Sequence, residues 1–155
     1  MVLILPVISI YSPLFVGYGG LLSSRVVASR IDTNLMLGDG STASLEYRQC
    51  GEDKKAEKAR HLTQHVVAHR NYLENVPLAM ALIGLLELNG ANRRLLHYLL
   101  GTLFVSRVAH AEFGIVGPDS RATGRIIGYL GTQAVILVAT AVNALHAYPY
   151  FFNRR

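Results

Sequence analysis

The chain has 155 residues, enough for one domain, and 51% of them are hydrophobic while only 16% are charged. A typical soluble domain has about 25% charged residues, so this composition argues against a soluble helical bundle. The single cysteine, Cys50, excludes an intramolecular disulfide. The net charge of +5 is explained by basic residues on one side of a membrane, and we expect no nucleic-acid partner.

Two long segments, residues 1–24 and 126–153, contain no charged residue. A helix needs about 20 mostly apolar residues to cross a bilayer, and both segments are long enough. The first segment lacks a basic n-region and a clear cleavage site, so we do not interpret it as a cleaved signal peptide. The two segments predict an integral membrane protein that crosses the bilayer more than once.

Apolar runs and turn signals predict a single all-α domain, residues 1–155, folded as an antiparallel four-helix membrane bundle. The GDG turn lies in a polar loop that we expect in the cytoplasm, and NGANRR and GPDSRATG mark the two later turns. The expected helices span residues 2–29, 56–88, 94–115 and 121–148, and the polar loop spans residues 31–55.

The distribution of positive charge predicts the topology. Eleven of the fifteen Lys and Arg residues fall at the ends of the helices that face the polar loop, and four fall at the opposite ends. The eleven are Arg25, Arg30, Arg48, Lys54, Lys55, Lys58, Arg60, Arg70, Arg107, Arg121 and Arg125. Because cytoplasmic segments carry the excess of positive charge, we expect both chain termini on the non-cytoplasmic side. In a bacterium, the membrane would be the inner one.

Polar residues inside the second and third helices point to a buried cluster. The stretch AHRNYLENVP places Glu74 one helical turn after Arg70 and Asn71, and SRVAH places Arg107 and His110 at a similar depth. Charged residues in a membrane face the bundle interior and pair with one another. We therefore expect an ion pair between Arg107 and Glu74, with Asn71 as a nearby hydrogen-bond partner.

The last helix carries a polar stripe. Arg125, Tyr129 and Gln133 are spaced four residues apart and so lie on one face. Arg30 and Arg121 are expected at the same level, which predicts an arginine-rich site at the cytoplasmic boundary, suited to an anionic ligand. Simpler interpretations also remain open. Glu74 and Arg107 would form only a structural clamp, Arg70 and Arg121 would reach the lipid headgroups, and Tyr129 would be an interfacial anchor.

A second histidine-rich pattern offers an alternative site. His61, His65 and His69 are spaced four residues apart, and two His at that spacing can bind one metal ion. The Glu of an HExxH motif is missing, and the third His is displaced around the helix by about 80°. We therefore expect no metal site and interpret the histidines as one face of an interfacial helix.

Four motifs together resemble the MAPEG family, the membrane-associated proteins of eicosanoid and glutathione metabolism. They are AHRNYLENVP, ELNGA, SRVAH and an Arg at the start of the last helix. The resemblance extends from Arg25 to about Ala147, and the LGDG turn is similar to the bacterial branch. It implies a homotrimer that binds glutathione between neighbouring subunits, near the cytoplasmic face.

The resemblance also implies roles for individual residues. Arg125 is the expected catalytic residue, helped by Arg30 and Tyr129. The residues expected to contact glutathione are Arg70, Asn71, Glu74, Arg107, His110 and Gln133. Two positions depart from the family pattern, because Val67 replaces an Arg and Gly114 replaces a Tyr that other members have.

The predicted activity is that of a glutathione transferase or peroxidase. Few thiols are ionised at neutral pH, because the thiol pKa is about 8.5, and a nearby guanidinium favours the thiolate. A lipophilic electrophile or hydroperoxide would reach the thiolate from the membrane lipid. The alternative is a non-catalytic member that binds a lipid or a partner protein in the same cleft.

Overall fold

The computed structural model describes residues 5–117 and 123–152, and all regular structure in these residues is helical. The elements are α1 (Pro6–Thr33), α2 (Ser41–Gln49), α3 (Asp53–Leu88), α4 (Arg93–Val108), the π-helix η1 (Ala109–Val116) and α5 (Thr123–Phe152). The expectation of an all-α chain is confirmed.

Three helices are long and apolar enough to cross a membrane: Pro6–Thr33, Arg93–Val116 and Thr123–Pro149. The chain is therefore a membrane protein. The helix expected over residues 56–88 is present as α3, but it is not among these three. Its first half contains the charged run DKKAEKAR, and its second half begins with the polar residues Asn71, Glu74 and Asn75, so neither half is apolar enough by composition.

The expectation of a polar loop over residues 31–55 is wrong, because α1 continues to Thr33 and α2 occupies the middle of this segment. Gly38 and Gly40 have positive φ angles of 76° and 83°, which reverse the chain before α2. Asp39 then accepts hydrogen bonds from the Ser41 hydroxyl at 2.7 Å and the Ser41 N–H at 3.0 Å. Both hydrogen bonds stabilise the ionised carboxylate and so lower the pKa of Asp39, and the bond from the Ser41 hydroxyl has the larger effect.

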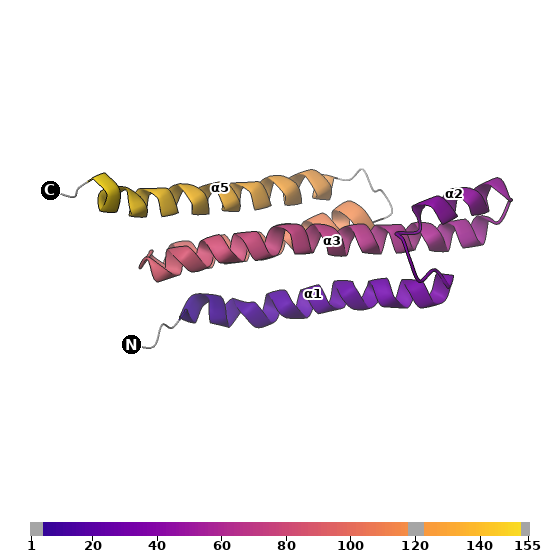
Figure 1. Cartoon of the computed structure of the whole chain (residues 1–155), viewed down its shortest axis with the longest axis horizontal. Helices are drawn as coiled ribbons and strands as arrows, with labels where there is room; N and C mark the ends of the chain where they lie inside the picture. Colours follow the sequence, from indigo (N-terminus) through magenta and orange to yellow (C-terminus); the bar gives the residue numbers. More distant parts are fainter. Residues whose placement is uncertain (1–4, 118–122, 153–155) are drawn as a thin grey trace.

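The helix α3 lies at the centre of the structure and contacts every other helix (Figure 1). The helices α1, α3 and α5 run side by side, and α4 with η1 lies beside α3 and α5. The start of α1 and the end of α5 lie at one end of the molecule, and α2 packs on α3 at the other end. Residues 2–4, where the first helix was expected to start, lie outside the described residues. So do residues 121 and 122, where the last helix was expected to start.

One face of α3 forms much of the core. Its buried positions, spaced three or four residues apart, are Ala68, Tyr72, Val76, Ala79, Ile83 and Leu86. Tyr72 also ties α3 to α1, since its buried hydroxyl donates a 2.6 Å hydrogen bond to the Phe15 carbonyl. Gly19 of α1 allows this approach, because a Cβ there would lie 3.1 Å from the Tyr72 ring.

Candidate functional site

Arg107 is buried at the junction of α3, α4 and α5, with 2% of its surface exposed. Its Nη1 donates to Asn71 Oδ1 at 2.6 Å, and its Nη2 donates to the Gly128 carbonyl at 2.8 Å. Its Nε has no hydrogen-bond partner among the described residues. The expected Asn71 contact is therefore present, but no carboxylate in residues 5–117 or 123–152 forms an ion pair with this buried cation.

The expected ion pair between Arg107 and Glu74 is wrong. Glu74 instead pairs with Arg70 on its own helix, at 2.9 Å, and both side chains are exposed. Side chains three residues apart on an α-helix differ in direction by about 60°, because each residue turns the helix by about 100°. Glu74 therefore points away from the direction in which Asn71 meets Arg107. Asn71 is thus the residue of this pair that meets Arg107.

Glycines bring α5 into close contact with α4 and η1. A Cβ on Gly128 would lie 2.5 Å from both His110 Cβ and the Ser106 carbonyl, and a Cβ on Gly124 would lie 2.8 Å from Phe113 Cβ. His110 Nδ1 lies 2.9 Å from the Arg125 carbonyl. Because a carbonyl only accepts, Nδ1 must carry the proton, and Nε2 of a neutral ring is then an acceptor. This packing fixes the first turns of α5.

A groove of about 480 Å³ opens between α3, η1 and α5. Its lining residues are Val67, Asn71, His110, Ile115, Arg125, Ile126, Tyr129 and Leu130. Four predicted site residues therefore meet here: Asn71, His110, Arg125 and Tyr129. The Arg125 side chain forms no hydrogen bond or ion pair with any residue that the structure describes, so its guanidinium is free to bind an anion.

The other predicted site residues lie outside the lining of this groove. Arg70 and Glu74 form their exposed pair, Arg107 lies behind Asn71, and Gln133 is half-buried further along α5. Arg121, expected at the same level, falls outside the described residues.

Arg30 does not join the groove as expected. Its Nη1 donates to the carbonyls of Leu35 at 3.2 Å and Met36 at 3.0 Å, and its Nη2 donates to the Gly38 carbonyl at 2.8 Å. A guanidinium at a helix C-terminus satisfies carbonyls that have no helical partner. Arg30 therefore holds the connection between α1 and α2.

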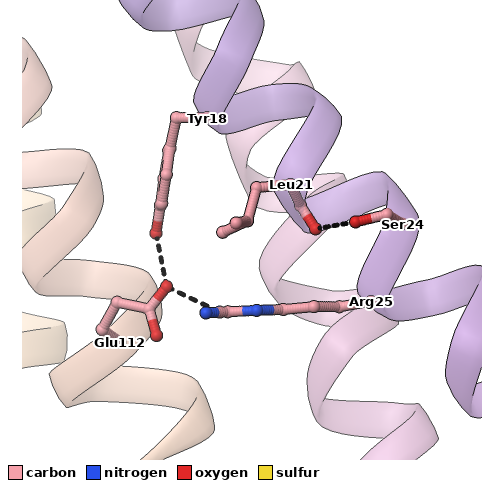
Figure 2. A network of polar contacts seen from close by, with 5 residues as sticks. All are labelled: Tyr18, Leu21, Ser24, Arg25 and Glu112. Atoms are coloured by element: carbon pink, nitrogen blue, oxygen red, sulfur yellow. Dashed lines mark hydrogen bonds and ion pairs between the residues drawn. The ribbon is translucent and has the colours of Figure 1, made fainter.

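Sequence reasoning missed a polar cluster between α1 and η1. Glu112 Oε1 accepts hydrogen bonds from Arg25 Nη1 at 2.7 Å and from the Tyr18 hydroxyl at 3.0 Å (Figure 2). A signal was present, because Glu112 is the only acidic residue between residues 94 and 115. An acidic residue in a membrane-capable helix implies a partner on another helix.

The histidine face of α3 makes ordinary structural contacts. His65 Nδ1 lies 2.7 Å from the Ser29 hydroxyl of α1, and His61 Nε2 lies 3.9 Å from Glu57. Within residues 5–117 and 123–152, no three His, Cys, Asp or Glu side chains are arranged to hold a metal ion. The contact with Ser29 gives His65 a role in joining α1 to α3.

The two departures from the expected pattern have structural counterparts. Val67 lines the groove, so an apolar wall stands where the family pattern has a cation. At Gly114, a Cβ would lie 2.6 Å from the backbone nitrogen of Arg125. A tyrosine at this position would displace the start of α5, so Gly114 is required by the packing that positions Arg125.

The model of the MAPEG family matches residues 8–145, nearly the whole chain. No curated protein and no solved structure matches the chain significantly. The matched segment contains every residue of the groove and of the Glu112 cluster.

Proposed function

The chain belongs to the MAPEG family, and we propose that it binds glutathione in the groove and activates the thiol against lipophilic electrophiles or hydroperoxides. Membership of this family supports a glutathione-related transferase or peroxidase function. The observation that carries the specific proposal is Arg125, an arginine of the groove whose side chain has no partner among the described residues. It lies among Asn71, His110 and Tyr129, which all offer hydrogen bonds.

The residues present suit an anionic, peptide-like thiol. Asn71 Oδ1 already accepts from Arg107, which turns the Asn71 Nδ2 donors toward other acceptors, such as a ligand carboxylate. Arg107 itself acts from behind, as a buried positive charge that raises the local potential. Arg70, Glu74 and Gln133 are proposed to contact the ends of glutathione once a neighbouring subunit closes the groove.

Arg125 is the proposed thiolate stabiliser. A guanidinium close to the sulfur lowers the thiol pKa from about 8.5 and so raises the thiolate fraction at neutral pH. The Tyr129 hydroxyl lines the same groove and is positioned to donate a hydrogen bond to the sulfur. Arg30 is bound to the loop between α1 and α2 and plays only an indirect part, by holding that loop.

The thiolate then reacts in one of two ways. With a carbon electrophile, a sulfur–carbon bond forms while the bond to the leaving group breaks, and the leaving group departs with the electron pair. With a hydroperoxide, the sulfur attacks the terminal oxygen and the O–O bond breaks, which yields an alcohol and a sulfenic acid. A second glutathione then reduces the sulfenic acid, and the products are glutathione disulfide and water.

We propose a homotrimer in which a second copy covers the groove. The α5 side of the groove is open, since Ile126 is 61% exposed, Leu130 is 59% exposed and Tyr129 is 53% exposed. Exposed apolar side chains beside polar donors suit a subunit interface better than bulk lipid alone. Closure by the neighbour would exclude water from the reacting sulfur.

We also propose four membrane crossings, with the α2 end in the cytoplasm. The second half of α3 would be the fourth crossing, because it lies alongside α1 and α5 and carries the apolar run from Val76 to Leu86. The excess of Lys and Arg at the α2 end supports this orientation.

The test is an ultraviolet difference spectrum of detergent-purified protein titrated with glutathione. The wild type should develop a saturable thiolate band and reduce cumene hydroperoxide. Arg125→Ala should lose both, and Arg94→Ala, a control at the exposed start of α4, should keep both. If Arg125→Ala retains the band and the turnover, the assignment of Arg125 is wrong.

The second candidate function is a non-catalytic site for lipid or a partner protein. The apolar wall formed by Val67 favours it, since that position would otherwise hold a cation for glutathione. An intact wild-type oligomer without a thiolate band at saturating glutathione would support this alternative.

A further inference from the structure

A cavity lies where the end of α1, the helix α2 and the start of α3 meet, and we call it the lysine pocket. Its volume is about 510 Å³. Its lining residues are Asp32, Thr33, Asn34, Tyr47, Lys54, Lys55 and Lys58. It shares no lining residue with the groove that contains Arg125. The proposed glutathione chemistry therefore gives this pocket no role.

The lining of the lysine pocket has an excess of positive charge, because its three lysines face one carboxylate, Asp32. Lys54 forms no hydrogen bond or ion pair with any residue that the structure describes. Lys55 pairs with Glu52 at 2.7 Å and Lys58 pairs with Asp32 at 2.8 Å, and these side chains are between 43% and 62% exposed. Exposed ion pairs are weak, so all three lysines are able to turn to an anionic ligand.

The chemistry of the lining favours a phosphate ester. The described lining contains lysines but no arginine, and separate ammonium groups suit the several charged oxygens of a phosphate better than the planar carboxylate that an arginine fork binds. The Asn34 amide and the Tyr47 hydroxyl have no hydrogen-bond partner among the described residues and are available to hydroxyls of the ester. The pocket also has the size of a small-molecule site, more than a lone phosphate ion needs.

The lysine pocket lies at the level where α1 leaves the membrane. The 28 residues of α1 measure about 42 Å, whereas the hydrocarbon core of a bilayer is about 30 Å thick and the headgroups bring it to about 40–45 Å. The last turns of α1, which end at Thr33, therefore reach the headgroup region. The pair between Asp32 and Lys58 places the lysines of α3 at this same level.

The connection between α1 and α2 turns back toward the membrane (Figure 1). A Cβ on Gly40 would lie 2.8 Å from the Ala59 carbonyl and 3.2 Å from Leu62 Cδ2. Both contacts are closer to the apolar half of α3 than the three lysines are. Between the pocket and Gly40, the connection carries two exposed apolar side chains, Met36 and Leu37, which we call the apolar pair. These side chains therefore lie on the membrane side of the pocket.

The apolar pair is presented by an ordered segment. Met36 is 64% exposed and Leu37 is 90% exposed. Arg30 holds the backbone around them, since its guanidinium donates to the carbonyls of Leu35, Met36 and Gly38. Apolar side chains next to a basic pocket at headgroup level are typical of an interfacial lipid site, where the apolar groups enter the acyl boundary and the cations meet lipid phosphates.

We propose that the lysine pocket binds the headgroup of an anionic phospholipid of the cytoplasmic leaflet. The lipid phosphate lies among the three lysines, headgroup hydroxyls meet Asn34 and Tyr47, and the acyl chains pass the apolar pair into the bilayer. A zwitterionic lipid binds more weakly, because its own cation is repelled by the lysines. The proposal uses the orientation with the α2 end in the cytoplasm and does not depend on glutathione.

The test is the binding of phosphatidylglycerol, labelled with a fluorophore on one acyl chain, to the purified full chain in a non-ionic detergent. Phosphatidylcholine with the same label is the comparison, and the wild type should bind it about tenfold more weakly. Lys54→Gln should weaken phosphatidylglycerol binding about fivefold and leave phosphatidylcholine binding unchanged. Arg48→Gln, which removes an exposed arginine of α2 outside the pocket lining, should leave the affinity for both lipids unchanged.

Equal affinity of the wild type for the two lipids would overturn the proposal. An equal loss in Lys54→Gln and Arg48→Gln would also overturn it, because general positive charge would then explain the binding. Glycerol 3-phosphate separates a lipid from a soluble phosphate ester and should displace the probe far less effectively than unlabelled phosphatidylglycerol. Equal displacement by the two would make a soluble ester the ligand, and the lipid assignment would be wrong.

Leu37 tests the path of the acyl chains. Leu37→Asn should weaken the binding of both lipids alike, by about three- to tenfold, because an apolar contact with the chains is lost. Leu37→Ile, which keeps the apolar surface, should bind both lipids as the wild type does. If Leu37→Asn also binds them as the wild type does, the acyl chains do not pass the apolar pair and the proposed site is wrong.

Discussion

Glu112 and Arg25 form an ion pair of 2.7 Å that joins the π-helix η1 to α1 (Figure 2). Their side chains are only 27% and 34% exposed, and Tyr18 adds a second hydrogen bond to the same carboxylate oxygen. The pair neutralises both charges inside helices long enough to span a membrane. It also holds η1, the element that carries His110 and Ile115 to the groove.

Glu112→Gln should destabilise the protein by about 1–3 kcal/mol, because Arg25 loses its only carboxylate partner among the described residues. The measurement is the thermal unfolding midpoint in detergent, followed by circular dichroism. Glu46→Gln, an exposed acid of α2, is the control and should change little. Adding Arg25→Gln should restore part of the loss, since two neutral partners replace an unpaired charge.

Equal midpoints for Glu112→Gln and the wild type would mean that the pair is screened and contributes nothing. A loss in Arg25→Gln that simply adds to the loss in Glu112→Gln would show that the two side chains act independently.

Asn71 offers a test of the buried Arg107. Asn71→Leu removes the acceptor of the 2.6 Å bond and leaves Nη1 buried without a partner, which should cost about 1–3 kcal/mol. Asn71→Asp should stay near wild-type stability, because the carboxylate accepts the same bond and compensates the cation. The new negative charge in the groove should nevertheless weaken glutathione binding, by about tenfold or more.

Thermal unfolding and the thiolate titration measure the two effects separately. The interpretation fails if Asn71→Asp is as unstable as Asn71→Leu, or if it binds glutathione as tightly as the wild type.

Helical spacing predicted which residues share a face, but not how two helices are rotated against each other. Asn71 and Glu74 stand one turn apart, and charge alone favoured Glu74 as the partner of Arg107. The contact with Asn71 depends on how α4 and α5 pack against α3, which the glycines of α5 decide. The spacing of Arg125 and Tyr129 on one helix, a local property, did predict that both line one groove.

Two misses have a similar physical origin. The segment around α2 lacks a long apolar run, so its helix depends on the turn at Gly38 and Gly40 and on contact with α3. Arg30 was expected in the groove because it lies at the right depth. Its guanidinium instead donates hydrogen bonds to the carbonyls of Leu35, Met36 and Gly38, which follow α1 in the chain.

Gly128 tests the close packing of α5. Gly128→Ala should destabilise the protein by about 1–3 kcal/mol, because the new Cβ would lie 2.5 Å from His110 Cβ and from the Ser106 carbonyl. Gly101→Ala is the matched control, since a Cβ there meets nothing within 4 Å. This control should be neutral or more stable by up to about 1 kcal/mol, from helix propensity.

Chemical unfolding in a fixed detergent gives the free energies of unfolding for both variants. If Gly128→Ala matches Gly101→Ala, then α5 does not need glycine at this contact, and the position of Arg125 must be set by other residues.

Glu87 of α3 caps the start of α1 from another helix. Its two carboxylate oxygens accept from the Val7 N–H at 2.7 Å and the Ile8 N–H at 3.0 Å, groups that have no partner within the helix. Glu87→Leu should therefore cost about 0.5–2 kcal/mol, and Glu87→Gln, which keeps one acceptor, should cost less. Hydrogen exchange at Val7 and Ile8 should be slowest in the wild type, faster in Glu87→Gln and fastest in Glu87→Leu.

Exchange at the α2 end of α1, around Ser29, serves as the internal control for the Glu87 variants and should not change. If exchange accelerates equally along the whole of α1 in Glu87→Leu, the residue supports the fold as a whole and is not a local cap.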